Sequence, residues 1–101
     1  MSMSLERRAY LVGETVTILI RVAEIGTSKP VEIDSITLER FHREGDEEGL
    51  DIDLDIESDD ELGAHWVRFQ TEGLQPGVYE VGFKTVSGSH VVIKRDRFVL
   101  S

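Results

Sequence analysis

Apolar and polar residues alternate strictly in several short segments of this chain, and this alternation restricts what the chain can fold into. The clearest case is residues 50–57, where four aliphatic side chains alternate with four carboxylates. Successive side chains of a β-strand point to opposite faces, so a strand would gather all the aliphatic residues on one face. A helix would spread the same carboxylates around its whole surface. We therefore predict a strand over residues 50–57.

The same reasoning, with glycine, proline and serine as turn signals, predicts further extended segments along the chain. We expect strands at residues 9–12, 16–22, 31–41, 64–71, 78–83 and 91–94, with residues 98–100 closing the chain. The turn 26–30 ends at Pro30, which cannot donate to a central ladder, so the next strand should begin after it. The apolar residues then change parity between Ile33 and Ile36, which predicts a β-bulge near Asp34 and Ser35.

No segment carries an apolar stripe at helical spacing. About seven short strands, with turns roughly ten residues apart, are typical of an all-β, two-sheet β-sandwich with Greek-key connections. An open barrel is the alternative. The length of 101 residues allows one domain, so we predict a single domain over residues 1–101. The repeated Met-Ser of residues 1–4 is typical of a cloning remnant, and we expect it to be disordered.

Composition excludes several classes of site and partner. The chain has no cysteine, which excludes disulfides, thiolate zinc sites and cysteine nucleophiles. Its longest apolar runs, such as residues 91–93, are far shorter than the ~20 residues that span a bilayer. The net charge of −9 argues against nucleic acid and anionic membranes, because both bind basic surfaces. We expect no nucleic-acid partner and no membrane insertion.

The negative charge is concentrated in one segment. Residues 44–61 contain 11 acids and no Lys or Arg, so the other 83 residues hold 9 acids and 11 bases. Clustered carboxylates suit Ca²⁺, which prefers oxygen ligands. The candidate metal ligands are Asp51, Asp53, Asp55, Asp59, Asp60 and Glu61. The EF-hand pattern is absent, because Ile56 stands where that loop requires glycine.

Strand geometry limits this calcium site. Carboxylates on one face of a strand lie ~6.6 to 6.8 Å apart, so one ion could bridge only two of the strand aspartates and would need the acids that follow. Two other interpretations remain open. In the first, the acids form a solvated face that protects a strand edge from aggregation. They would also serve electrostatic docking to a basic protein partner.

Other candidate residues give weaker patterns. His42, His65 and His90 would form a zinc site only if folding brought them together. A hydroxyl precedes His90, but neighbouring residues of a strand point to opposite faces, which excludes a nucleophile–base pair there. Trp66 is a candidate platform for stacking a sugar. The segment 95–97, Arg-Asp-Arg, is expected to pair with the acidic strand.

Two stretches carry a resemblance to known families. Residues 9–20, AYLVGETVTILI, resemble the opening of macroglobulin-type and bacterial immunoglobulin-like modules, where a tyrosine, a Gly-Glu turn and an alternating strand begin the sandwich. Residues 74–79, LQPGVY, are similar to the corner of fibronectin type III domains, whose tyrosine hydroxyl bonds back to the corner backbone. That tyrosine would be Tyr79. The resemblance implies an immunoglobulin-like sandwich that serves binding, spacing or adhesion, since such modules are rarely catalytic.

We therefore expect a non-catalytic module, a spacer, adhesion or protein-interaction domain within a larger surface or secreted protein. The first alternative is a calcium-binding module that uses residues 44–61, and Ca²⁺ is the one cofactor considered. The second is a carbohydrate-binding accessory domain of an enzyme, acting through Trp66. The expected partner is a protein, and a basic one if the acidic segment makes the contact. An exposed edge strand would also allow two copies to pair as a homodimer.

Overall fold

The structure is a computed structural model that describes residues 2–27, 29 and 31–101. Ser28 and Pro30, in the predicted turn at 26–30, lie outside the described residues, as does Met1. The described residues form eight strands and no helix. The strands are β1 (Ser2–Leu5), β2 (Ala9–Tyr10), β3 (Thr15–Arg21), β4 (Ser35–Arg43), β5 (Asp55–Asp59), β6 (Ala64–Gln70), β7 (Gly77–Ser87) and β8 (His90–Leu100). No helix in this part of the chain is long and apolar enough to cross a membrane.

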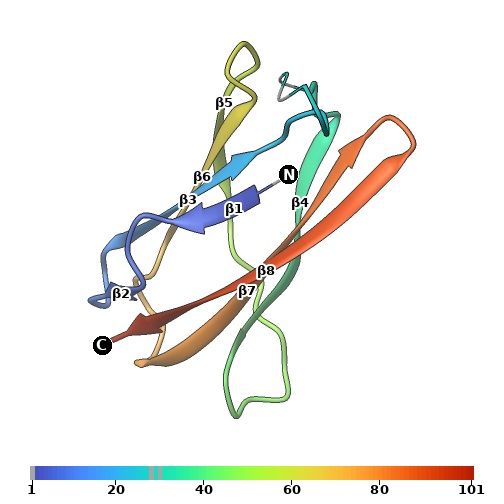
Figure 1. Ribbon diagram of the computed structural model, residues 1–101. Helices are drawn as coiled ribbons and strands as arrows, with labels where there is room; N and C mark the ends of the chain where they lie inside the picture. Colours follow the sequence, from blue (N-terminus) through green and yellow to red (C-terminus); the bar gives the residue numbers. More distant parts are fainter. Residues whose placement is uncertain (1, 28, 30) are drawn as a thin grey trace.

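The strands form two four-stranded sheets that face each other as a sandwich (Figure 1). We call the sheet with the order β1-β3-β6-β5 sheet A, and the sheet with the order β2-β8-β7-β4 sheet B. All neighbouring strands are antiparallel except β2, which runs parallel to β8. The predicted all-β, two-sheet sandwich is confirmed, with eight strands rather than seven, and the open-barrel alternative is wrong.

The core lies between the sheets and is built by alternation along the strands. In β3 the inward residues Val16, Ile18 and Ile20 are buried, while the residues between them are partly exposed. The centre of the core is an aromatic cluster. Phe41 from β4 stacks on Tyr79 from β7, with ring centroids 5.5 Å apart. Such contacts add to the large apolar area that aromatic rings bury.

Tyr79 forms the corner that the sequence predicts. Its hydroxyl donates a hydrogen bond to the Gln75 carbonyl oxygen, 2.5 Å away, and its ring stacks on Phe98. Burial raises the pKa of this hydroxyl, so it remains a donor. Arg43 closes the corner from outside through hydrogen bonds to the Gln75 side chain and the Pro76 carbonyl. The corner therefore joins β4, the turn and β7.

The strand predicted over residues 50–57 is wrong in its first half. Residues 50–54 belong to no sheet, and β5 begins at Asp55. The Leu50 N–H donates to the Phe41 carbonyl, 2.7 Å away, so the chain leaves the edge of β4 here and crosses to sheet A. Ile52 and Leu54 pack against the core during this crossing. The alternation thus reflects one buried face, without a hydrogen-bonded ladder.

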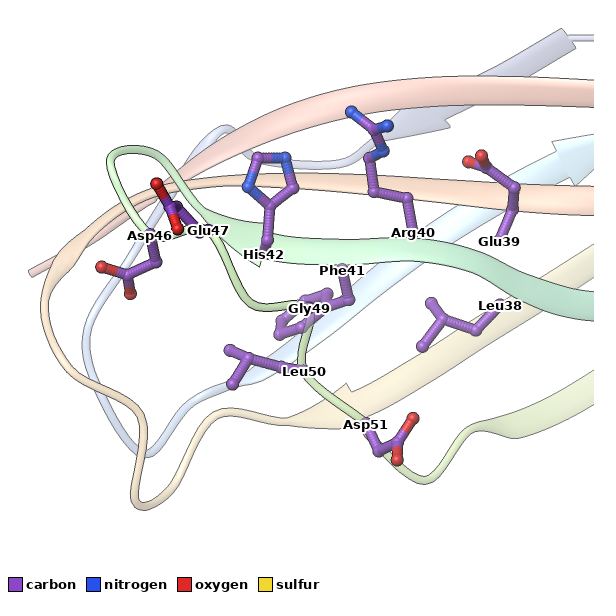
Figure 2. Close-up of a pocket in the computed structure, with 10 residues that line it drawn as sticks. All are labelled: Leu38, Glu39, Arg40, Phe41, His42, Asp46, Glu47, Gly49, Leu50 and Asp51. Atoms are coloured by element: carbon purple, nitrogen blue, oxygen red, sulfur yellow. The ribbon is translucent and has the colours of Figure 1, made fainter.

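Strand β4 also differs from the prediction for residues 31–41. It spans Ser35–Arg43, and its register shifts between Leu38 and Arg40 rather than near Asp34 and Ser35. Figure 2 shows the cause: Glu39 and Arg40 project from the same side of the strand, while Leu38 and Phe41 point to the other side. The shift restores an inward direction for Phe41, which is part of the core.

The N-terminal segment differs from expectation as well. We expected residues 1–4 to be disordered, but β1 (Ser2–Leu5) pairs with β3 along its whole length, from Ser2 opposite Arg21 to Leu5 opposite Ile18. Met3 and Leu5 pack against the core. These two apolar side chains on one face explain why the segment joins the sheet.

Candidate functional site

Most of strand β8 is paired with another strand on one side only. Strand β7 pairs with β8 along its full length, from Gly77 opposite Leu100 to Ser87 opposite His90. On the other side, the short strand β2 pairs only with Val99 and Leu100. In Figure 1 the β7–β8 hairpin, in orange and red, is the longest pair in the molecule. We call residues 90–97 the open β8 edge.

The backbone groups that point outward along this edge can be identified. The N–H groups of Val99 and Ser101 donate to carbonyls of the β2 segment, at 2.8 and 2.9 Å. Backbone groups of alternate residues in a strand point to the same side. Those of Val91, Ile93 and Arg95 therefore also point away from β7, where no strand of the described chain pairs with them. Such unpaired groups are a template for another strand.

The open β8 edge is also apolar near the hairpin tip. Val91, Val92 and Ile93 are 54%, 36% and 48% exposed. Beside this run, a cleft of about 390 Å³ lies between the tip of the hairpin and the segment that joins β3 to β4. Its apolar lining includes Val22, Ile25, Val31, Ile33 and Val92. The edge thus combines backbone donors and acceptors with apolar surface, the two features that bind an extended peptide.

Basic side chains follow the apolar run. The edge contains three bases, Lys94, Arg95 and Arg97, and one acid, Asp96. Its formal charge is therefore 3 − 1 = +2. Asp96 is bound by Arg8, with 2.5 Å between Arg8 Nη1 and the Asp96 carboxylate. Lys94 takes part in no ion pair of the described chain. Lys94 is therefore the base of this edge that is available to a carboxylate of a partner.

The predicted pairing of Arg95 and Arg97 with the acidic strand is wrong. Arg95 forms a bidentate salt bridge with Glu39 of β4, with hydrogen bonds of 2.7 and 3.1 Å. This salt bridge lowers the pKa of the Glu39 carboxyl. Arg97 lies near Glu44 and Glu80, at 3.4 and 4.0 Å. The reason is the sheet order, because β4 lies in sheet B with β8 and β5 does not.

The six predicted calcium ligands do not form one site. Two precede β5, two lie on it and two lie in the turn before β6; in chain order they are Asp51, Asp53, Asp55, Asp59, Asp60 and Glu61. Within the described residues, no group of three acids or histidines is placed to hold a metal ion. The Asp59 carboxylate instead accepts hydrogen bonds from the N–H groups of Glu61 and Leu62, at 3.1 and 3.2 Å. Its observed role is to stabilise the β5–β6 turn.

A wide hollow lies along β4, between that strand and the loop that follows it (Figure 2). It measures about 530 Å³, and its lining includes His42 together with Asp46 and Asp51 of the acidic segment. The His42 Nε2 atom is buried, lies 3.7 Å from the nearest Glu80 oxygen and makes no hydrogen bond. The hollow brings no second histidine to His42, so it has no zinc-binding arrangement.

The other two histidines lie on separate strands. His90 is exposed at the start of β8, and the nearby Ser87 hydroxyl donates to the Glu32 carbonyl instead of to a histidine. His65 on β6 is only 3% exposed, and its Nδ1 lies 2.8 Å from the Ser58 hydroxyl oxygen. Its Nε2 is buried and makes no hydrogen bond in the described structure. Burial lowers the pKa of His65, so the ring is neutral at pH 7.

The Ser58–His65 contact was missed in the sequence. The two residues face each other across the β5–β6 hairpin, and this register follows from the turn at residues 60–63. Our predicted strand ended at residue 57, which left Ser58 in the loop. A hydroxyl beside a histidine is the beginning of a nucleophile–base pair, but no carboxylate is bonded to the other ring nitrogen here.

Trp66 lies on β6 with its side chain directed opposite to that of His65, opposite Leu19 of β3 and Glu57 of β5. It is partly exposed on the outer face of sheet A. Its partners in the two neighbouring strands are thus a leucine and a glutamate. Carbohydrate binding through Trp66 stays a prediction.

Comparison with known proteins shows the fold. No protein-family model matches the chain, and no curated protein matches it. Among solved structures, the chain is similar to one described as "ZirS C-terminal Domain", with a TM-score of 0.70 and 21% sequence identity over 99% of this chain. The chain shares its fold with the ZirS C-terminal domain. It spans 64% of the length of that solved ZirS chain, so this sandwich matches part of a longer structure.

Proposed function

We propose that the chain is a non-catalytic, immunoglobulin-like module of a larger protein, and that it binds a protein partner by adding a strand of that partner to the open β8 edge. The observation that carries this proposal is the row of outward backbone groups at Val91, Ile93 and Arg95 beside exposed apolar side chains. A strand added there would complete these hydrogen bonds and bury alternate side chains.

The apolar end of the open β8 edge, at residues 91–93, lacks the devices that protect other edges. Natural proteins shorten exposed edges, bulge them or place charges and proline along them. Here β8 pairs without a register shift along its length, and the run Val91–Val92–Ile93 contains neither charge nor proline. An edge of this kind favours association with another strand.

Three observations support the remaining parts of the proposal. The Tyr79 corner agrees with an immunoglobulin-like module, and the likeness to a C-terminal domain agrees with a module of a larger protein. The non-catalytic assignment draws on Ser58 and His65, because the second ring nitrogen of this pair has no carboxylate to orient it.

The test uses a synthetic extended peptide of alternating valine and threonine, followed by NMR of the labelled chain. We expect amide signals of Val91, Ile93 and Arg95 to shift on titration, because their N–H groups point to the open side. Ile93→Pro removes one such N–H without breaking the β7 ladder, and we expect it to abolish these shifts. Ile93→Ala is the matched control, since it keeps the N–H and should retain them in weaker form. Shifts confined to another surface, or none, would contradict the proposal.

A further inference from the structure

Sheet A also ends in an open strand, β5. The Val22 N–H donates to the Gly63 carbonyl, 3.1 Å away, so this carbonyl points toward β3. The N–H of the same trans peptide unit, that of Ala64, points the opposite way, toward β5. Backbone groups alternate in direction along a strand. The backbone N–H and C=O groups of the β5 residues opposite Ala64 and Trp66 therefore point to β6. Those of Ile56 and Ser58 point outward. We call residues 55–59 the open β5 edge.

The open β5 edge is chemically complementary to the open β8 edge. Asp55, Glu57 and Asp59 give it a charge of −3, and Ile56 between them is 39% exposed. Asp51 and Asp53, just before the strand, extend this acidic surface. By contrast, the open β8 edge has a charge of +2 and an exposed aliphatic run. One edge thus offers an aliphatic residue flanked by acids, and the other offers aliphatic residues flanked by bases.

The two open edges lie on opposite sides of the sandwich. Strand β1 of sheet A lies against β8 of sheet B, so these strands share one side of the molecule. Strands β5 and β4, at the far ends of the two sheet orders, share the other side. A single copy therefore cannot join its own two edges. Two copies can, with one copy contributing each edge, which is a head-to-tail contact.

We propose that the strand bound by the open β8 edge is the open β5 edge of a second copy of this chain. This inference rests on the proposed function and names its partner. Opposite charges favour this pairing over two β8 edges, where basic residues would approach each other. Because β5 is short, we expect an interface at the low end of the range, near ~1,200 Å² or less, and hence weak, concentration-dependent association.

The experiment uses two variants, each with one open edge blocked. Ile93→Pro removes an outward N–H from β8, and Ile56→Pro removes one from β5, and neither removes a ladder hydrogen bond. Sedimentation velocity of the wild-type chain should show a mean mass that rises with concentration. Each variant alone should stay monomeric. An equimolar mixture should form a one-to-one pair and nothing larger, because each variant supplies the edge that the other has lost.

A second pair of variants guards against proline unfolding the chain. Ile93→Glu places a carboxylate on the basic edge, and Ile56→Lys places an ammonium on the acidic edge. Each should lose self-association and the mixture should restore it, with circular dichroism confirming that both are folded. Leu11→Glu is the matched control, because Leu11 is an exposed aliphatic residue outside both edges and its replacement should leave association unchanged. Salt near 1 M should weaken the wild-type association, since screening then acts over ~3 Å.

The outcomes separate this inference from the proposed function. Self-association that survives Ile56→Pro but not Ile93→Pro would mean symmetric pairing of two β8 edges and would overturn the head-to-tail contact. A wild-type chain that stays monomeric at every concentration would overturn it as well. If the valine–threonine peptide still binds β8 in either case, the proposed function stands. If that peptide also fails to bind, both proposals are wrong.

Discussion

His65 is the buried residue that should couple stability to pH. Burial lowers its pKa in the folded chain, while in the unfolded chain the value returns to about 6.5. The unfolded state therefore binds more protons as the pH falls below 6.5, so stability is complete above that pH and is lost as the pH falls through the lowered pKa of the folded chain. Asp60, which acts in the opposite direction, moderates the effect.

We expect His65→Gln to flatten this pH dependence below about pH 6.5, the usual pKa of histidine. Urea denaturation at several pH values measures it, and His90→Gln, at an exposed position, is the control. Ion-paired carboxyls such as Glu39 and Glu80, whose pKa values are lowered, act in a separate and more acidic range. An unchanged slope in His65→Gln would show that His65 is not the titrating group.

Two substitutions at Tyr79 distinguish the contribution of its hydrogen bond from that of its ring packing. Tyr79→Phe removes the bond to the Gln75 carbonyl and keeps the ring between Phe41 and Phe98, so we expect a loss of about 1 kcal/mol. Tyr79→Ala also removes the buried ring and should cost about 3 to 5 kcal/mol. Denaturant unfolding measures both. Equal losses in the two variants would mean that the ring contributes nothing beyond the hydroxyl.

Sequence could predict Tyr79 at this scale because its corner is local: the turn and the tyrosine lie within six residues, 74–79. The Ser58–His65 contact depends on the register of a hairpin, which one misplaced strand end was enough to hide. Contacts between residues close in the chain can therefore be predicted from the sequence. Contacts set by strand register can be predicted only when the ends of both strands are known.

At the level of elements, the alternation of apolar and polar residues predicted which side chains face the core. It was less reliable in predicting which segments form hydrogen-bonded strands. Residues 50–54 keep Ile52 and Leu54 against the core and the aspartates in solvent, yet they form no sheet because Leu50 is bonded to the edge of β4. The shift in β4 was readable in the sequence, because Leu38 and Phe41 are spaced by three residues where a regular strand would use two. The open edges were not readable, because they depend on sheet order and on how few residues of β8 the strand β2 covers.

At the level of the whole molecule, the charge of −9 is the difference between an acidic segment of −11 and a remainder of 11 − 9 = +2. Figure 1 shows the acidic segment spread along the loop after β4, strand β5 and the turn at its end. Carboxylates distributed in this way repel one another without surrounding a common point. The stability of the fold should therefore rise with ionic strength of any kind, because salt screens the repulsion.

This reasoning makes the calcium alternative testable. We expect millimolar CaCl₂ to raise the midpoint of thermal unfolding no more than NaCl of the same ionic strength. A site with a dissociation constant a hundredfold below the calcium concentration would add about 2.7 kcal/mol. For a domain of this size each kcal/mol shifts the midpoint by about 4 to 8 °C, so such a site would be plain to see.

A triple variant decides between repulsion and ligation. Replacing Asp51, Asp53 and Asp55 with asparagine removes three of the clustered charges while keeping the size of the side chains. If repulsion dominates, the variant should be more stable than the wild type at low salt, and the two should converge as NaCl is added. If these aspartates bind calcium, the variant should instead lose a stabilisation that the wild type gains from CaCl₂ and not from NaCl. The same variant also weakens the acidic surface around the open β5 edge, so its sedimentation should show less self-association at low salt than that of the wild type.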